Sequence, residues 1–266
     1  MSGMRPAGLR RLVLAFPPAA VPQHAIDSAA QLARLMRASL LGLFVEDSDL
    51  FVAAQLPFMR ELDVQLRAWR PLSHQRLLED YAASAAALRR QLLQSAAQSG
   101  VPAKFAVFRG DPGTTVVSRA LPTDFVALFE SVTTWPGRPP SQAAGTVFVP
   151  RAARPRRGPV VVVCGAAEDL AVEVATEIAA DAGVERILVD AAQDRSSAFW
   201  SGRSAVRGFP LAAPRTVPTS AEHFLPSGLP PASLVVLTRA TLAQHEARLL
   251  SIAAARPEPW LVLEQR

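Results

Sequence analysis

The stretch from Ala103 to Glu130 decides the fold, and it reads AKFAVFRGDPGTTVVSRALPTDFVALFE. The apolar run Phe105–Phe108 predicts a strand, and Phe125–Phe129 predicts a second one. Between them a Gly-Asp-Pro turn opens a short helix, because proline suits the first helical position. A strand, a helix and a strand in this order form a βαβ unit, the repeat of parallel sheets. The sequence therefore predicts an α/β protein with an open parallel sheet.

A ligand position follows from this topology. In open parallel sheets ligands bind beyond the carboxyl ends of the strands. We therefore expect Gly110, Asp111 and Glu130 to border any binding site in this half. Gly110 is expected to supply backbone freedom for the turn, and Asp111 is placed to cap the helix that follows.

Composition restricts the class of protein. The chain has 266 residues, half of them hydrophobic, which is enough for one large domain or two smaller ones. Its single cysteine, Cys164, excludes an internal disulfide and suits a reducing cytoplasm. The net charge is +5, and 27 of the 28 basic residues are arginines. They are scattered apart from Arg151, Arg154, Arg156 and Arg157, so we do not expect nucleic acid as a partner. No segment approaches the roughly 18 apolar residues of a membrane span, and the run Leu12–Phe16 is too short for a signal peptide.

The rest of residues 1–150 extends the βαβ unit into one domain. Phe16 and Val45 end two predicted strands on the side where the ligand is expected. The predicted strands are 11–16, 40–45 and 146–149, and the predicted helices are 22–37 and 71–98, with Gly100 as the signal that ends the second helix.

Residues 46–70 are too apolar for a solvated loop and too long for a simple connection. The segment carries Leu50, Phe51, Val52, Leu56, Phe58 and Met59 among acids and arginines. One interpretation is a lid or helical hairpin that packs on its own domain. The other is an exposed apolar patch used for dimerisation or for a partner.

These motifs carry a resemblance to a known family. Arg109-Gly-Asp-Pro112 follows the third strand, and Asp124–Phe129 forms the fourth. Together with Leu43–Asp47, followed by Leu56–Arg60, this order resembles the universal stress protein family over residues 9–150. The resemblance implies a five-stranded parallel sheet with helices on both faces, frequent dimerisation, and ATP binding by some members.

The chain departs from the ATP-binding members of that family. Their fourth strand is followed by Gly-x2-Gly-x9-Gly-Ser/Thr, where glycines admit phosphates and a helix amino terminus favours anions. Here Gly137 and Gly145-Thr146 stand at the wrong spacing, and Gly145-Thr146 leads directly into a strand. Glu130 adds negative charge, and Phe16 stands where the family has an aspartate that meets the base. We therefore expect no cofactor and regard the cleft as vestigial.

In an alternative interpretation the protein does bind a nucleotide. In that alternative ATP or AMP binds through a non-standard phosphate loop, with Gly137, Gly145, Arg109 and Arg138 near the phosphates. A third interpretation, an arginine-rich adaptor for nucleic acid or an acidic partner, has less support, because the arginines are scattered.

Residues 160–266 repeat the opening order in trimmed form. A Pro/Arg-rich linker, 151–159, precedes them. The predicted strands are 160–163, 187–189, 216–217, 232–237 and 260–263, with helices over 168–182 and from Thr241, which Gln244 would complete as a capping box. The sequence thus predicts tandem domains, packed as a pseudo-dimer through their final strands.

No constellation of catalytic residues stands out. Arg239 at a strand end could bind a small anion, but a surface arginine is the simpler interpretation. Cys164 is expected to be a buried structural thiol. His245 is expected to be a satisfied core or rim histidine, and Glu46-Asp47-Asp49 a solvated acidic loop or helix cap. We therefore expect a cytoplasmic, non-enzymatic protein of the stress response that binds a protein partner, itself or a small ligand.

Overall fold

The fold was analysed in a computed structural model of the whole chain. The structure describes residues 10–16, 21–63, 67–130, 143–165, 169–190, 215–217 and 232–264. No described helix is long and apolar enough to cross a lipid bilayer.

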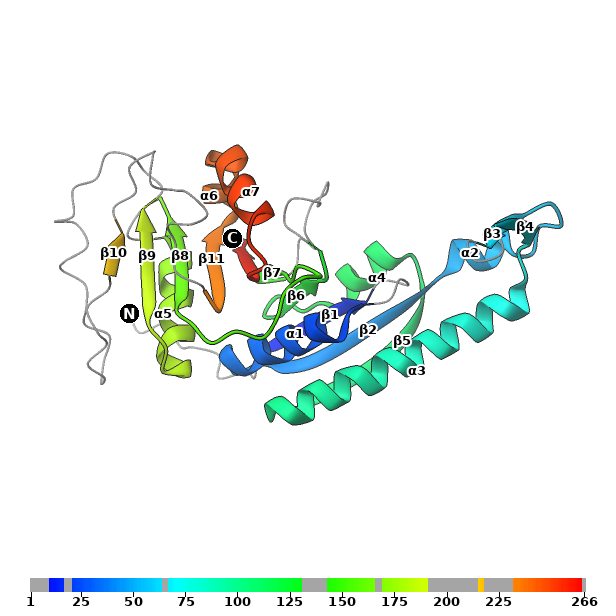
Figure 1. The fold of residues 1–266 in the computed structure, drawn as a ribbon, viewed down its shortest axis with the longest axis horizontal. Coiled ribbons are helices and arrows are strands. Elements are labelled where there is room, and N and C mark those ends of the chain that lie inside the picture. The colour runs from blue at the N-terminus through cyan, green and yellow to red at the C-terminus, as the bar shows by residue number, and fades with distance from the viewer. Residues whose placement is uncertain are drawn as a thin grey trace.

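A single ten-stranded sheet runs through the molecule (Figure 1). Its strands, in spatial order, are β10 (Arg215–Val217), β9 (Arg186–Asp190), β8 (Val160–Cys164), β11 (Leu234–Thr238), β12 (Trp260–Leu263), β7 (Gly145–Phe148), β6 (Phe125–Leu128), β1 (Arg11–Phe16), β2 (Ser39–Asp47) and β5 (Ala103–Gly110). All neighbours are parallel except β12 and β7, which run antiparallel. The predicted α/β class with a mostly parallel sheet is confirmed.

Each half of the chain contributes five strands in the same order. In residues 11–148 the order is β5-β2-β1-β6-β7, and in residues 160–263 it is β10-β9-β8-β11-β12. The two sets meet where β7 pairs with β12, so that Gly145 faces Leu263 and Phe148 faces Trp260. The division into domains at residues 150 and 160 stays a prediction, because one sheet crosses both limits.

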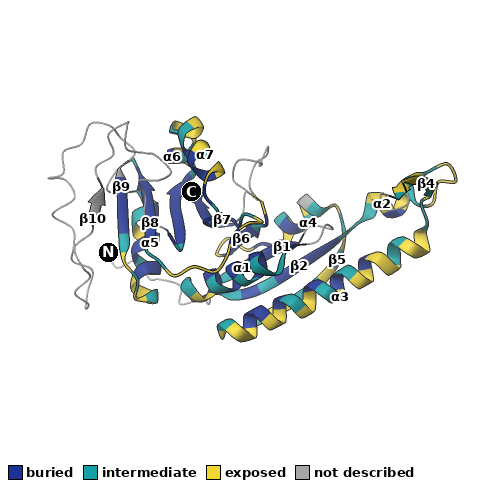
Figure 2. Cartoon of the chain, viewed as in Figure 1, coloured by how far each residue is buried: buried dark blue, intermediate teal, exposed yellow. Residues whose placement is uncertain are grey.

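Helices cover both faces of the sheet, and successive side chains of a strand pack alternately against the helices of one face and of the other. Leu12 and Leu14 of β1 join the core cluster that contains residues of α1 (Gln23–Leu35), α3 (His74–Ser99) and α5 (Leu170–Ala182). Val13 joins the opposite face, with α4 (Pro112–Arg119), and further along that face lie α6 (Arg239–Gln244) and α7 (Glu246–Ala254). Because both faces are covered, the central strands are buried throughout, as Figure 2 shows.

The helix boundaries follow local capping. α3 begins at His74 rather than at the predicted Pro71, because Pro71 pairs in a strand and the Ser73 hydroxyl accepts a hydrogen bond from the Arg76 amide. Its predicted end is confirmed, since Gly100 adopts a left-handed conformation with φ of 67°.

The helix predicted from Thr241 begins earlier and is interrupted. Thr238 caps α6 by accepting a hydrogen bond from the Thr241 amide, so the predicted capping box at Thr241 is wrong. His245 lies between α6 and α7 with φ of −124°, which breaks the helix. Its Nε2 is buried without a hydrogen-bond partner, so the predicted satisfied histidine is also wrong.

Residues 46–70 do not form the predicted helical hairpin. They form α2 (Ser48–Ala53) and an antiparallel pair, β3 (Arg60–Asp63) and β4 (Ala68–Pro71). Figure 1 shows this segment projecting beyond the body, at the end remote from the second half. It lies beside the amino-terminal end of α3, a helix roughly 39 Å long at 1.5 Å per residue.

Gly145 allows the close approach of β7 to β12. A Cβ atom at this position would lie 2.8 Å from the Val262 carbonyl oxygen, which belongs to the backbone and cannot rotate away. We predict that Gly145→Ala lowers the free energy of unfolding by about 1–3 kcal/mol, because the strands must separate. Denaturant unfolding measures this change.

Gly165→Ala is the matched control for Gly145→Ala. Among the described residues, a Cβ atom at Gly165 would meet only the Gln244 side chain, at 3.9 Å, which is an ordinary contact. Its backbone does not adopt a positive φ, so the substitution should be neutral or slightly stabilising. Equal losses in the two variants would contradict the proposed role of Gly145.

Candidate functional site

The strand-end position in the first half is filled by aromatic rings. Phe16, at the end of β1, stacks on Phe129, which follows β6, with ring centroids 5.2 Å apart and an angle of 21°. Phe105 of β5 lies 6.0 Å from Phe16 on another side. Phe16 is only 4% exposed. Apolar rings thus occupy the point where the strand order reverses, which is the usual ligand position in such sheets.

Val45 and Gly110, which were predicted to border the site at neighbouring strand ends, are surrounded by other residues of the fold. Val45 is buried and pairs with Phe108. Gly110 does not adopt a left-handed conformation, so its predicted role in backbone freedom is wrong. A Cβ atom there would lie 2.8 Å from the Thr115 hydroxyl, which belongs to a side chain and would have to rotate away.

Asp111 caps α4 as predicted. Its carboxylate accepts a hydrogen bond of 2.7 Å from the Thr114 amide. This bond, together with a contact to the Thr114 hydroxyl, lowers the pKa of Asp111. One oxygen of the carboxylate is therefore engaged by its own helix.

Gly145 and Thr146 do not border the expected cleft. They pair with Phe125 and Val126, at the amino end of β6, which is the opposite edge of the sheet from Phe16. The sequence interpretation of these residues as remnants of a phosphate loop is therefore corrected, because they form the seam with β12. Glu130 is exposed just after β6, and Gly137 lies outside the described residues.

Arg109 is engaged by protein groups. Its guanidinium donates two hydrogen bonds, of 2.8 and 3.0 Å, to one oxygen of Glu46. The same guanidinium lies 4.2 Å from the centre of the Phe51 ring. The alternative that places Arg109 near phosphates would require both contacts to break. Its second arginine, Arg138, lies outside the described residues.

The strand-end position in the second half is closed by polar groups. The Asp169 carboxylate accepts one bond from the Ala171 amide and another, of 3.1 Å, from the Thr241 hydroxyl. Arg239, predicted as a possible anion ligand, donates instead to both oxygens of Glu264. Cys164 is buried and donates to the Val189 carbonyl oxygen, as expected of a structural thiol.

No group of three or more His, Cys, Asp or Glu side chains in the described part of the chain could hold a metal ion. In the Glu46-Asp47-Asp49 cluster, Asp47 caps α2 through the Asp49 amide and Glu46 binds Arg109. The described histidines lie apart. His24 contacts the Arg151 carbonyl oxygen, and His74 lies edge-on to Phe51. The fourth, His223, is outside the described residues.

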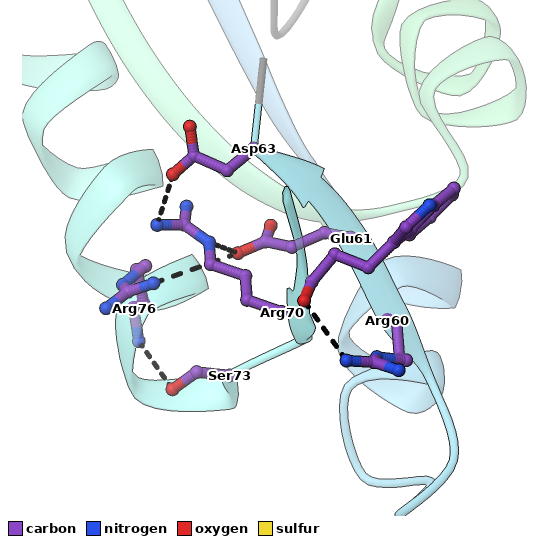
Figure 3. Close-up of polar contacts among 7 residues, drawn as sticks. Arg60, Glu61, Asp63, Arg70, Ser73 and Arg76 are labelled. Carbon is purple, nitrogen blue, oxygen red and sulfur yellow. Dashed lines mark hydrogen bonds and ion pairs between the residues drawn. The ribbon is translucent and has the colours of Figure 1, made fainter. Parts of the chain in front are cut away.

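The strongest candidate surface lies on the projecting segment, which we call the arm and define as residues 48–63 and 67–71. Alternation in β3 and β4 gives the hairpin two faces. On the inner face Arg70 binds Glu61 at 2.6 Å and Asp63 at 2.8 Å, and Arg76 of α3 lies 4.0 Å from Glu61 (Figure 3). The charged face of this hairpin is therefore turned towards the protein.

The apolar face of the hairpin is turned outward. Leu62 and Trp69 lie directly opposite each other on the two strands and are 51% and 61% exposed. Phe58, just before β3, is 71% exposed. This orientation is the reverse of the usual arrangement, in which the apolar face of a hairpin packs on its domain. The arm thus presents apolar side chains to solvent on a hairpin fixed by ion pairs.

The base of the arm is firmly packed. Phe51 of α2 is buried and stacks on Tyr81 of α3, with centroids 5.5 Å apart. Arg109 covers another side of the Phe51 ring, and Tyr81 meets Phe44 of β2 edge-on. These contacts join α2, α3, β2 and β5, so the arm is anchored to the sheet.

The comparisons with known proteins agree with this topology. No protein-family model matches the sequence, and no curated protein matches it. Solved structures do match. A universal stress protein from Archaeoglobus fulgidus DSM 4304 is similar over 96% of both chains, with a TM-score of 0.59 and 13% identity. The chain has the universal stress protein fold.

Two structures from Pseudomonas aeruginosa extend this finding. The functionally unknown protein PA1789 from strain PAO1 is 13% identical, covers 97% of this chain and 93% of its own, and gives a TM-score of 0.51. A putative universal stress protein from strain UCBPP-PA14 is 15% identical, with coverage of 97% and 94% and a TM-score of 0.50. The universal stress protein fold thus spans both halves of the chain.

Tyr81 reports on the base of the arm. Burial raises the pKa of the Tyr81 phenol above the ordinary value of about 10, and the carboxylates of Asp47 and Glu46 add to the rise. Because Tyr81 is the only tyrosine in the chain, phenolate absorbance follows it alone. We predict a titration midpoint above that of a free tyrosine derivative. The associated stability is complete below pH about 10 and is lost as the pH rises through the raised pKa.

Two variants test the cause of this raised pKa. Phe51→Ala uncovers the phenol and should lower its pKa towards the ordinary value. Phe108→Ala removes a ring from the opposite face of the sheet and should leave the titration unchanged. An ordinary midpoint in the unmodified protein would contradict the packing at the base of the arm.

Proposed function

We propose that this chain is a non-enzymatic universal stress protein that acts in the stress response by binding a protein partner through the arm. The observation that carries this proposal is the outward apolar face of the β3–β4 hairpin. Large exposed apolar patches on monomers mark interaction sites, and aromatic residues are enriched at the centres of protein interfaces.

The strand ends support a role without ATP. Phe16 and Phe129 occupy the position where this fold commonly receives a ligand, and apolar rings offer no hydrogen bonds to a base or ribose. Arg109, which the nucleotide alternative places near the phosphates, is bound to Glu46. Phosphate groups would therefore have to compete with existing contacts.

The absence of enzymatic activity is part of the proposal. Catalysis by side chains needs an acid, base or nucleophile held within hydrogen-bond reach of a second such group and accessible to substrate. In the described residues the one cysteine is buried and the histidines lie on separate elements. The arm, by contrast, is exposed and is joined to the body through Phe51 and Tyr81.

We predict that ATP and AMP at millimolar concentration leave the melting temperature unchanged. A ligand present at a hundred times its dissociation constant would stabilise the native state by about 2.7 kcal/mol. Differential scanning calorimetry would record such binding as a shift of several degrees, which would contradict the proposal. The rate of phosphate release from ATP in the presence of the protein should equal the rate in buffer alone.

The same measurement on the Phe16→Ala variant shows whether the Phe16 ring excludes nucleotides. If nucleotides stabilise the variant but not the unmodified chain, the Phe16 ring is what excludes them. If they stabilise both equally, a nucleotide site exists elsewhere and the proposed function without ATP is wrong.

A further inference from the structure

We propose that the linker, residues 151–159, is a docking surface for an acidic segment of a protein partner. The linker joins β7 to β8 and contains no acidic residue, but it carries Arg151, Arg154, Arg156 and Arg157. It is a different surface from the arm, which projects at the other end of the molecule (Figure 1). The inference therefore goes beyond the proposed function and does not depend on it.

The linker is fixed to the body of the protein at several points. The His24 ring lies 2.7 Å from the Arg151 carbonyl oxygen, and Ala153 is completely buried in the core cluster that contains residues of α1 and α5. At the far end of the linker, the Pro159 carbonyl oxygen accepts hydrogen bonds from the amide and the hydroxyl of Ser233. A segment that is already ordered costs less to bind, because little conformational freedom remains to be lost.

Arg156 differs from the other arginines of the linker, because it binds the protein itself. Its guanidinium lies 3.4 Å from a carboxylate oxygen of Glu258, which is only 3% exposed. The same carboxylate also pairs with Arg256, at 3.0 Å. This buried carboxylate therefore holds the linker against the second half of the chain, and its charge is already matched by two guanidinium groups.

The other three arginines of the linker are exposed. In the part of the chain that the structure describes, none of Arg151, Arg154 and Arg157 forms an ion pair with a carboxylate. Figure 2 shows the chain between β7 and β8 mainly in the colour of exposed residues. The linker thus presents a strip of uncompensated positive charge on an ordered backbone, and charge complementarity selects an acidic partner for it.

The composition of the linker favours an acidic protein segment over other polyanions. The linker has no aromatic side chain on which the bases of a single-stranded nucleic acid could stack. Its three exposed, unpaired arginines are fewer than the about four to eight basic residues that mark a protein surface for anionic lipids. A guanidinium binds a carboxylate through two parallel hydrogen bonds, so an acidic segment can use each of these arginines.

Fluorescence anisotropy with a labelled decaglutamate peptide tests this inference on the full chain. The peptide should bind at low ionic strength and dissociate as salt is added, because salt screens exposed charges. The triple variant Arg151→Gln, Arg154→Gln, Arg157→Gln should weaken binding about tenfold, since each exposed ion pair strengthens binding only a few-fold. A peptide that does not bind the unmodified chain at low ionic strength would overturn the proposal.

A second triple variant, Arg89→Gln, Arg90→Gln, Lys104→Gln, is the matched control. It removes the same amount of positive charge from exposed positions on α3 and β5. It should bind the peptide as the unmodified chain does, and circular dichroism should show that both variants are folded. Equal weakening in the two variants would mean that net charge alone attracts the peptide, and the linker would then have no special role.

Two further probes separate an acidic segment from other polyanions. Labelled oligothymidylate represents single-stranded nucleic acid, and phosphatidylcholine–phosphatidylglycerol vesicles represent an anionic membrane. If either binds the unmodified chain more tightly than decaglutamate does, and loses this binding in the linker variant, that polyanion replaces the acidic segment and the proposal is wrong. None of these measurements involves the arm or ATP, so the failure of this inference and the failure of the proposed function are distinguishable.

Discussion

The antiparallel pairing of β7 with β12 determines the architecture of the whole molecule. Every other pairing in the ten-stranded sheet is parallel and lies within one half of the chain. At the seam, Gly145 lets one backbone approach the Val262 carbonyl, and Trp260 lies opposite Phe148. On one face of the sheet a core cluster continues from β1 to β11 across this seam. Ion pairs from Arg10, just before β1, to Glu177 and from Arg37, just after α1, to Asp181 join α5 to the first half of the chain.

This seam also explains why the two halves can differ at their strand ends. Once the sheet is continuous, neither half needs a ligand to complete its core. In the first half aromatic rings fill the position above the sheet, and in the second half Asp169 and Thr241 link two helix ends across it. Both solutions satisfy the groups present, one by apolar packing and the other by hydrogen bonding.

Local signals in the sequence predicted most of the sheet. Buried parallel strands read as continuous apolar runs, such as Val160–Val163, and glycine marked the end of α3. The arm was not predicted as a hairpin, because β3 and β4 are short and their alternation, Arg60-Glu-Leu-Asp and Ala68-Trp-Arg-Pro, places charges inward. Gly145 was assigned to phosphate binding, whereas the structure shows that it is set by the close approach of the Val262 backbone, and Gly110, assigned to backbone freedom, has no positive φ. Such distances depend on tertiary packing, so a single sequence does not contain them in readable form.

The edge of the sheet at β5 has a consequence for how the protein stays in solution. β5 has eight residues and, in the described part of the chain, a paired strand on one side only, so that its other side could accept a foreign strand. The only lysine of the chain, Lys104, lies exposed on this strand, and so does Arg109. Charged side chains on an edge oppose the stacking of one sheet onto the next. Lys104 and Arg109 thus work against open-ended, fibre-like growth at the β5 edge.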